Sequence, residues 1–354
     1  MRKFFVFTSA LVVSGSMALA MGEDAMDEGM MMDGAPSVAV GGSGKIGIKS
    51  VDDSSEPDAE QFKLVRAYKV TFASTGTTDG GLMFGAGMSI RDDTGEKDVT
   101  NDEGEKVQGP AVKGSYVFVG GADGSWKLQF GGNDPGIDLA GGFGLADDHF
   151  GGEDDVSMAL SGTFGNTNYR ITAAAPDATG DGDNDWSVGV SHSINTISVG
   201  VGMDSERGLA IGVGTDLSGV STFLYWSKSE IRNVDFFQQL AEENRFVGTQ
   251  YLGTQEYTGL GVKASMSAGE GATFSVGYST LKLVQYVTDG DPISREGTEQ
   301  SKLIEVDFSY DLGGGATLSV GIDKEDRQEI TDIDPPPLEE SDITTLEAAI
   351  AFTF

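Results

Sequence analysis

The sequence predicts an all-β fold, namely a 16-stranded antiparallel up-and-down barrel built to lie in a membrane. Apolar and polar residues alternate in short blocks along most of the chain, as expected for strands with one face on each side of a sheet. Tight turns and long polar loops alternate between these blocks. Beyond the first 20 residues no apolar run reaches the ~20 residues that a helical membrane span needs, so any spanning segment must be a strand.

The first residues resemble an export signal. The chain opens with Met1, Arg2 and Lys3, continues through a mostly apolar stretch and reaches small residues at Ala18 and Ala20, which is typical of a secretory signal peptide. A transmembrane helix is the competing interpretation, but the stretch is short and interrupted by serine and threonine. The expected units are a signal peptide at 1–20, a flexible, acidic and Met-rich mature N-terminus at 21–37, and a barrel at 38–354.

The charge balance and the lack of cysteine narrow the classes of protein. The chain has 23 Lys plus Arg against 56 Asp plus Glu, a net charge of −33, which excludes nucleic acid as a partner. It has no cysteine, so neither a disulfide framework nor a thiolate zinc site can hold an exported fold together. A closed, hydrogen-bonded sheet can do so instead.

Sixteen strands can be placed in the sequence. They are expected near 39–49, 64–74, 81–91, 112–121, 125–131, 155–164, 168–176, 185–193, 196–204, 208–216, 220–229, 254–266, 272–282, 301–311, 316–325 and 342–354.

The connections between these strands fall into two classes. One class is short and rich in residues that tolerate a positive φ, for example 76–80, 122–124 and 313–315. The other class is long and acidic or polar, for example 92–111, 132–154 and 230–253. Because the classes alternate, one rim of the barrel carries turns and the other carries loops, which is typical of outer-membrane barrels.

The alternation also assigns the two faces of the strands. Ile304, Val306, Phe308 and Tyr310 alternate with Glu305, Asp307 and Ser309, so we expect the first set to face lipid and the second a polar interior. A barrel of about 16 strands is wide enough to leave an aqueous channel. Aromatic residues near the strand ends suit the membrane interfaces, with ordinary sheet packing as the alternative for each: Tyr68, Phe72, Tyr116, Trp126, Tyr169, Trp186, Tyr278 and Tyr310.

Two hairpins and the C-terminus resemble the trimeric porins of the Rhodobacter type, within the Gram-negative general porins. The segments are Thr71–Ala86, with Gly76-Thr77-Thr78-Asp79-Gly80 at its turn, and Ser309–Ala316, with Gly313-Gly314-Gly315 at its turn. Phe354 resembles the terminal aromatic residue that serves as an assembly signal for the barrel-assembly machinery. The resemblance implies a homotrimer in the bacterial outer membrane, and a third long loop, here 132–154, that folds into the lumen and narrows it.

The same resemblance implies that acids of this loop face bases on the opposite wall. The acids are Asp134, Asp138, Asp147 and Asp148. Alternation along the strands places Lys45, Lys69, Arg91, Lys127 and Arg170 on the lumenal side, and we expect Lys45, Lys69, Lys127 and Arg170 to form the basic wall of the constriction. Charge rings of this kind tune ion selectivity. The alternative is that these are solvated wall charges with no shared geometry.

Other chemistry finds less support in the sequence. The two histidines, His149 and His192, cannot form a metal triad; His192 is expected at an interface, and His149 in the constriction loop could respond to pH. No cofactor is expected. Acids clustered in the loops, including Asp52, Asp53, Glu153, Asp154 and Asp155, could bind Ca²⁺ or bridge to lipopolysaccharide phosphates, although solvated loops are the simpler interpretation.

The sequence therefore predicts an outer-membrane porin, not an enzyme, through which ions and small hydrophilic solutes diffuse passively. Two alternatives stay open. One is a substrate-selective outer-membrane channel, and the other, from a different class, is an exported all-β structural or adhesive protein whose acidic loops bind cations.

Overall fold

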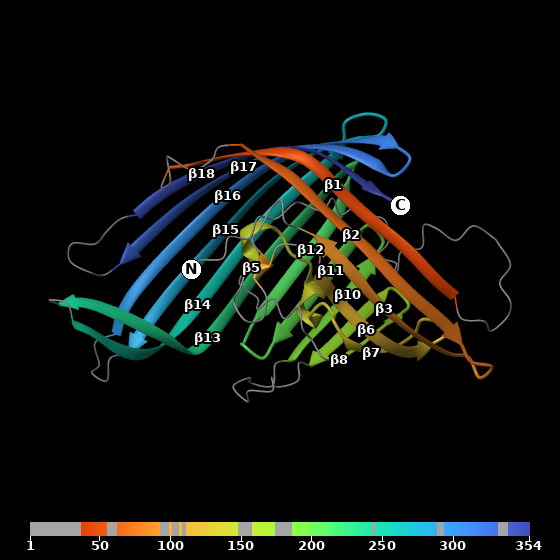
Figure 1. Ribbon diagram of the computed structural model, residues 1–354, viewed down its shortest axis with the longest axis horizontal. Helices are drawn as coiled ribbons and strands as arrows, with labels where there is room; N and C mark the ends of the chain where they lie inside the picture. Colours follow the sequence, from red (N-terminus) through yellow and green to blue (C-terminus); the bar gives the residue numbers. More distant parts are fainter. Residues whose placement is uncertain are drawn as a thin grey trace.

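The computed structural model describes residues 37–54, 62–92, 99–100, 106–107, 111–147, 158–173, 186–242, 245–288, 294–331 and 339–354. Sixteen antiparallel strands close into a barrel in which each strand pairs with its neighbours in the barrel order (Figure 1). The expected signal peptide at 1–20 and almost all of the Met-rich segment lie outside the described residues.

The barrel strands run in chain order around the wall. They are β1 (Ser37–Asp53), β2 (Phe62–Thr77), β3 (Leu82–Asp92), β6 (Ala111–Gly121), β7 (Lys127–Gly131), β8 (Met158–Phe164), β9 (Thr167–Ala173), β10 (Trp186–Ile194), β11 (Ile197–Asp204), β12 (Leu209–Leu217), β13 (Val220–Glu242), β14 (Arg245–Ser267), β15 (Ala272–Thr288), β16 (Ser294–Gly313), β17 (Ala316–Thr331) and β18 (Glu339–Thr353). Two short 3₁₀ helices, η1 (Gly136–Ala140) and η2 (Gly144–Ala146), follow β7. No helix among the described residues is long and apolar enough to cross a membrane.

The first and last strands close the barrel. β1 pairs antiparallel with β18 from Ser43 opposite Thr353 to Asp53 opposite Ile343. Phe354 continues this seam, because its N–H donates to Gly42 O at 3.0 Å and its carbonyl accepts from Gly42 N at 2.9 Å. Closure leaves neither strand with an unpaired edge, which is the condition for a sheet in lipid.

Several predicted loops were wrong in part, because strands extend into them. The segment 230–253 was expected to be a loop, but β13 and β14 continue through it as a paired ribbon up to Glu242 opposite Arg245. The segment 92–111 contains a two-stranded sheet of β4 (Val99–Thr100) and β5 (Lys106–Val107). Polar composition marks such segments as solvated, but it does not distinguish a loop from a strand pair that extends beyond the membrane.

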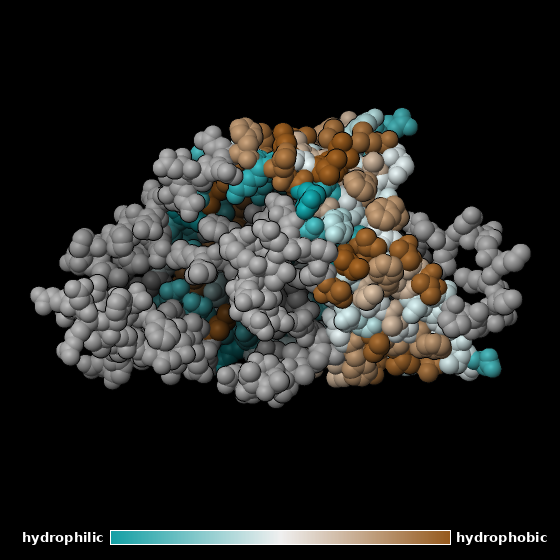
Figure 2. All heavy atoms as spheres, viewed as in Figure 1, coloured by the Kyte–Doolittle hydropathy of each residue, from teal (hydrophilic) through white to brown (hydrophobic). Residues whose placement is uncertain are grey.

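The outer and inner faces follow the alternation of the sequence. Along β16, Ile304 and Phe308 are exposed on the outside, whereas Glu305 between them is only 4% exposed. Figure 2 shows apolar side chains over much of the outer surface on the right of the view, with polar ones visible in the hollow on the left. An apolar exterior and a polar interior are what a membrane barrel with a wet lumen requires.

Tyr116 departs from the expected interfacial ring. It pairs with Gly87, and Gly87 lies on the inward face of β3 together with Arg91. The Tyr116 ring covers Gly87, because a β-carbon added there would stand 2.5 Å from the Tyr116 hydroxyl. The register shift between Gly87 and Ser89 in the β3–β6 pair, with Gly114 at φ +62, disturbs the alternation here. Such a bulge cannot be read from period-two patterning.

A charge placed on the outer face tests this assignment. We expect Val306→Arg to destabilise the folded barrel by ~2–4 kcal/mol if the residue lies near the bilayer midplane, because arginine there faces hydrocarbon. The measurement is reversible unfolding in lipid vesicles. Thr71→Arg on the inward face of β2 is the control and should change the free energy of unfolding little; equal effects from the two variants would contradict the assignment.

Candidate functional site: the loop segment docked on the inner wall

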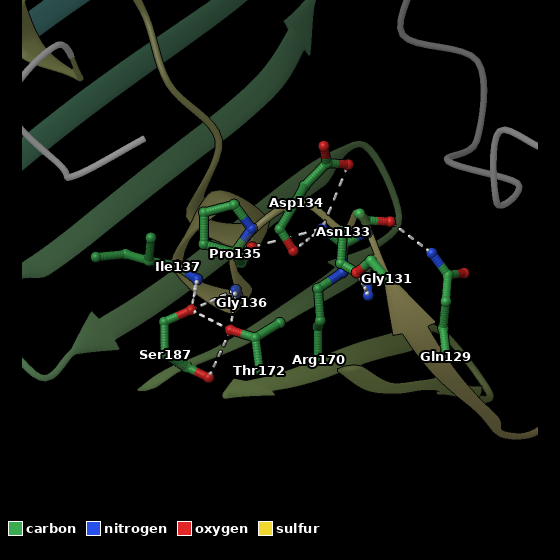
Figure 3. Close-up of polar contacts among 11 residues, drawn as sticks. Gln129, Gly131, Asn133, Asp134, Pro135, Gly136, Ile137, Arg170, Thr172 and Ser187 are labelled. Atoms are coloured by element: carbon green, nitrogen blue, oxygen red, sulfur yellow. Dashed lines mark hydrogen bonds and ion pairs between the residues drawn. The ribbon is translucent and has the colours of Figure 1, made fainter. Parts of the chain in front are cut away.

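The segment that follows β7 begins with a set of polar contacts to the barrel wall (Figure 3). Gln129 Nε2 donates to Gly132 O at 2.9 Å, and Asn133 Nδ2 donates to Gly131 O at 2.9 Å. Arg170 Nη1 on β9 lies 3.7 Å from Asp134 Oδ2 and donates to Asp134 O at 3.3 Å. These contacts direct the chain away from the rim and along the inner face.

Hydroxyl groups of the wall then hold the first turn of η1. Gly136 N donates to Ser187 Oγ at 2.5 Å and to Thr172 Oγ1 at 3.2 Å, and Ile137 N donates to Ser187 Oγ at 3.3 Å (Figure 3). The first N–H groups of any helix lack partners within the helix. Because Ser187 and Thr172 are both buried under η1, these wall side chains take the place of a capping residue.

Glycines of β10–β12 form the surface on which η1 rests. A β-carbon added at Gly189 would overlap Gly136 O, one at Gly202 would stand 2.5 Å from Ile137 Cα, and one at Gly212 would overlap Ala140 O. Gly200 is in the same situation beneath Leu139 and Ala140. We call Gly189, Gly200, Gly202 and Gly212 the glycine seat, since the backbone of η1 lies closer to these strands than any side chain would permit.

A second seat receives η2 on β13–β16. Leu145 N donates to Ser279 Oγ at 3.0 Å, and Ser227 Oγ donates to Ala146 O. The Phe143 ring lies over Gly261 and Gly277, with Lys263 Nζ 5.1 Å from the ring centroid. The segment 132–147, called the docked segment below, therefore contacts β9–β12 through η1 and β13–β16 through η2. Figure 1 shows these two short helices inside the outline of the barrel.

The predicted acids of this segment lie in different surroundings. Asp134 and Asp138 are exposed, whereas Asp147 is largely buried and its Oδ1 has no hydrogen-bond partner in the described part of the chain. Burial, and secondarily the negative charge of Asp138, raise the pKa of Asp147 from 3.8 to about 7, although a hydrogen bond from the Phe143 backbone N–H opposes the shift. Asp148 and His149 lie outside the described residues.

The predicted bases do not form one cluster. Lys127 on β7 and Arg170 on β9 both pair with Ser161 of β8, and both interact with Asp134. Lys69 lies directly opposite Arg91 in the β2–β3 pair. Lys45 instead forms an ion pair with Glu347 across the closing seam, with Nζ 2.5 Å from Oε1.

Sequence reasoning missed a second group of charges, on the wall beneath η2. Glu305 on β16 lies directly opposite Asp323 on β17, and Asp307 is the next inward residue along β16. Lys263 acts electrostatically on both Glu305 and Asp323, and Lys49 acts on Asp323. The alternation along β16 placed Glu305 and Asp307 on the polar face, but only the strand register shows that Glu305 faces another acid.

The remaining predicted residues have ordinary surroundings. His192 Nδ1 lies 2.8 Å from Thr167 Oγ1 on the exposed outer face near a turn. No three acidic or histidine side chains among the described residues converge to hold a metal ion. Of the acids proposed for Ca²⁺, Glu153, Asp154 and Asp155 lie outside the described residues.

Comparison with known proteins agrees with this architecture. The sequence profile described as Gram-negative porin matches residues 8–329. The chain belongs to the Gram-negative porin family. A search of curated protein sequences gives no significant match.

Solved porin structures share the fold at low sequence identity. A mutant of the Rh. blastica porin is 12% identical with a TM-score of 0.57, and the match covers 90% of this chain and all of that one. The trimer form of OmpT from Vibrio cholerae is 11% identical with a TM-score of 0.61, again over 90% of this chain and all of that one. OmpF of Salmonella typhi, in complex with daunomycin, is 11% identical with a TM-score of 0.58 over 90% of this chain and 97% of that one.

The porin is thus a channel of the bacterial outer membrane through which small solutes diffuse passively. The family and the closed barrel indicate a channel rather than an enzyme, and they decide against the exported adhesive protein.

The glycine seat gives a matched pair of variants on one strand. We expect Gly212→Ala to displace η1 and change the single-channel conductance, because its β-carbon would overlap Ala140 O. Overpacking of this kind costs ~1–3 kcal/mol. Gly214→Ala on the same face of β12 is the control. Its β-carbon would stand 2.6 Å from Ser198 Oγ, which can rotate away, and the next atom is 3.7 Å distant. Equal conductance in the two variants would show that the seat does not position the segment.

The raised pKa of Asp147 predicts a pH dependence of the docked segment. The docked state holds the proton more tightly than an undocked one, so docking is strongest at acidic pH, weakens as the pH rises from about 4 to about 7, and changes no further above that range. We expect current fluctuations of single channels to increase over this interval. Asp147→Asn should flatten the profile and Asp79→Asn, in an exposed turn, should not; a pH-independent wild type would contradict the assignment.

Proposed function

We propose that the porin is a cation-preferring, size-limited diffusion channel in which the loop 132–154 forms the constriction. The observation that carries the proposal is the double docking of this segment, on β9–β12 through η1 and on β13–β16 through η2. A segment anchored at two places on the inner wall occupies part of the lumen at a fixed position. Its anchoring sets the free cross-section that a solute meets.

The preference for cations follows from the distribution of charge. Asp134 and Asp138 are exposed on the segment, and the chain carries a net charge of −33. Lys127 and Arg170 remain near Asp134 at the start of the segment. These two bases offset part of the negative charge at Asp134, while the excess of acids over the whole chain favours cations.

We infer that three such channels assemble as a homotrimer. β7 has five residues and β11 has eight, whereas a tilted strand needs about 9–11 residues to cross the hydrocarbon core. The outer face of β11 is nonetheless apolar, with Ile197, Val199, Val201 and Met203 exposed. A neighbouring protomer would cover this part of the wall, whose strands are too short to span the hydrocarbon core of the membrane.

Contacts with the membrane and with the assembly machinery complete the proposal. The apolar outer surface suits outer-membrane lipid and lipopolysaccharide. Phe354 ends the chain at the seam with Gly42, where a C-terminal aromatic residue can be read by the barrel-assembly machinery before closure.

Planar-bilayer recording tests the channel, the trimer and the charge preference together. We expect stepwise conductance in which channels close in groups of three steps, and no saturable block by a single sugar. In a salt gradient, the reversal potential should show that cations permeate more readily than anions. Asp134→Asn combined with Asp138→Asn should lower the cation-to-anion permeability ratio by roughly 1.5- to 5-fold, the range for ~0.2–1 kcal/mol at an exposed charge.

Asp79→Asn, in the turn at the opposite rim, is the control and should leave the ratio unchanged. Saturable block by one solute would replace the general channel with a substrate-selective one. An unchanged ratio in the double variant would remove Asp134 and Asp138 from the constriction.

A further inference from the structure

Glu305 is a buried carboxylate whose charge is incompletely compensated. It is 4% exposed, and its Oε2 atom has no hydrogen-bond partner within the described part of the chain. The strand register places it between Gly277 of β15, which the Phe143 ring covers, and Asp323 of β17. An ionised carboxylate in such a place costs several kcal/mol unless a cation or hydrogen-bond donors compensate it.

Two bases lie nearby: Lys49 acts on Asp323, and Lys263 acts on Glu305 without compensating its charge. Lys263 is on β14, in the same row as Gly277, and it influences Glu305 electrostatically. Its Nζ instead lies 5.1 Å from the centroid of the Phe143 ring, and no ion pair joins it to Glu305 among the described residues. Asp323, directly opposite Glu305, and Asp307 add negative charge, and like charges opposite each other destabilise a strand pair.

A neutral hydroxyl oxygen of the wall and the backbone of the docked segment lie beside the same carboxylate. A β-carbon added at Gly144 would overlap Ser279 Oγ and stand 3.5 Å from Glu305 Oε2, so the η2 backbone, the Ser279 hydroxyl and the carboxylate lie together. Ser279 is fully buried and already accepts a hydrogen bond from Leu145 N. Hard oxygen donors of this kind bind alkali and alkaline-earth cations.

We propose that Glu305, Asp323, Ser279 and the backbone at Gly144 form a binding site for one alkali-metal cation, Na⁺ or K⁺, which fastens η2 to the barrel wall. Two carboxylates with a neutral oxygen can hold a monovalent ion, and no three acidic or histidine side chains among the described residues converge on one point. The cation offsets one of the two negative charges of the Glu305–Asp323 pair and joins β16, β17 and the docked segment. The position of the constriction then depends on the salt in which the channel works.

Single-channel recording in two chloride salts tests this site, and the recording relies on the channel proposed above. The whole porin is compared at constant ionic strength and pH in KCl and in the chloride of N-methyl-D-glucamine, whose cation is too large to enter a buried pocket. We expect transient closures in the organic salt to be about tenfold more frequent, which corresponds to ~1.4 kcal/mol. Addition of KCl should restore the quiet state along a saturable curve.

Glu305→Gln keeps the shape of the side chain and removes its charge, so this variant should close equally often in both salts. Asp323→Asn should weaken the dependence on K⁺, and Asp216→Asn, an inward acid on β12 bonded to Ser221, is the matched control that should retain it. Heat-dependent gel mobility checks that each variant forms the barrel.

The possible results separate this site from the proposed function. Absence of stepwise conductance would overturn the diffusion channel itself. Normal steps with equal closure in both salts, or a Glu305→Gln variant that still responds to K⁺, would overturn only the cation site. A response to pH in place of K⁺ would show that a proton occupies the pair and would likewise overturn it.

Discussion

The structure depends on one constraint: backbone N–H and C=O groups in hydrocarbon must find partners within the protein. The 16 strands meet it by closing, with β1 paired to β18 and the Phe354 backbone bonded to Gly42 at the end of the seam. An open sheet would leave two unpaired edges in lipid. The apolar outer face and the polar inner face are consequences of this closure, because successive residues of each strand point to opposite sides of one cylinder.

A cylinder of this size leaves an interior that no core fills, and the docked segment uses part of it. The η1 backbone packs directly against the backbone of the glycine seat. The side-chain hydroxyls of Ser187 and Thr172 on the wall accept hydrogen bonds from the backbone N–H groups at the start of η1. Close approach of two backbones excludes water from those hydrogen bonds and fixes the segment by geometry. The constriction is thereby built from the same rigid wall that spans the membrane.

The charges of the interior are arranged around that segment. Lys69 of β2 lies opposite Arg91 of β3, whereas Glu305, Asp307 and Asp323 cluster on β16 and β17 beneath η2. Like charges opposite each other weaken a strand pair, so the barrel carries this arrangement at some cost to its stability.

The sequence by itself determined the strand number, the two faces of the wall and the alternation of turns and loops, because period-two patterning and positive-φ turn residues act over neighbouring positions. For example, the alternation of apolar and polar residues from Ile304 to Tyr310 is enough to assign the outer and inner faces of that strand. Only the tertiary structure decided the partners across strands: that Lys45 pairs with Glu347, that Glu305 faces Asp323, and that Tyr116 points inward after a bulge. Those contacts depend on register and on where η1 and η2 dock, and both are set by residues far apart in the chain.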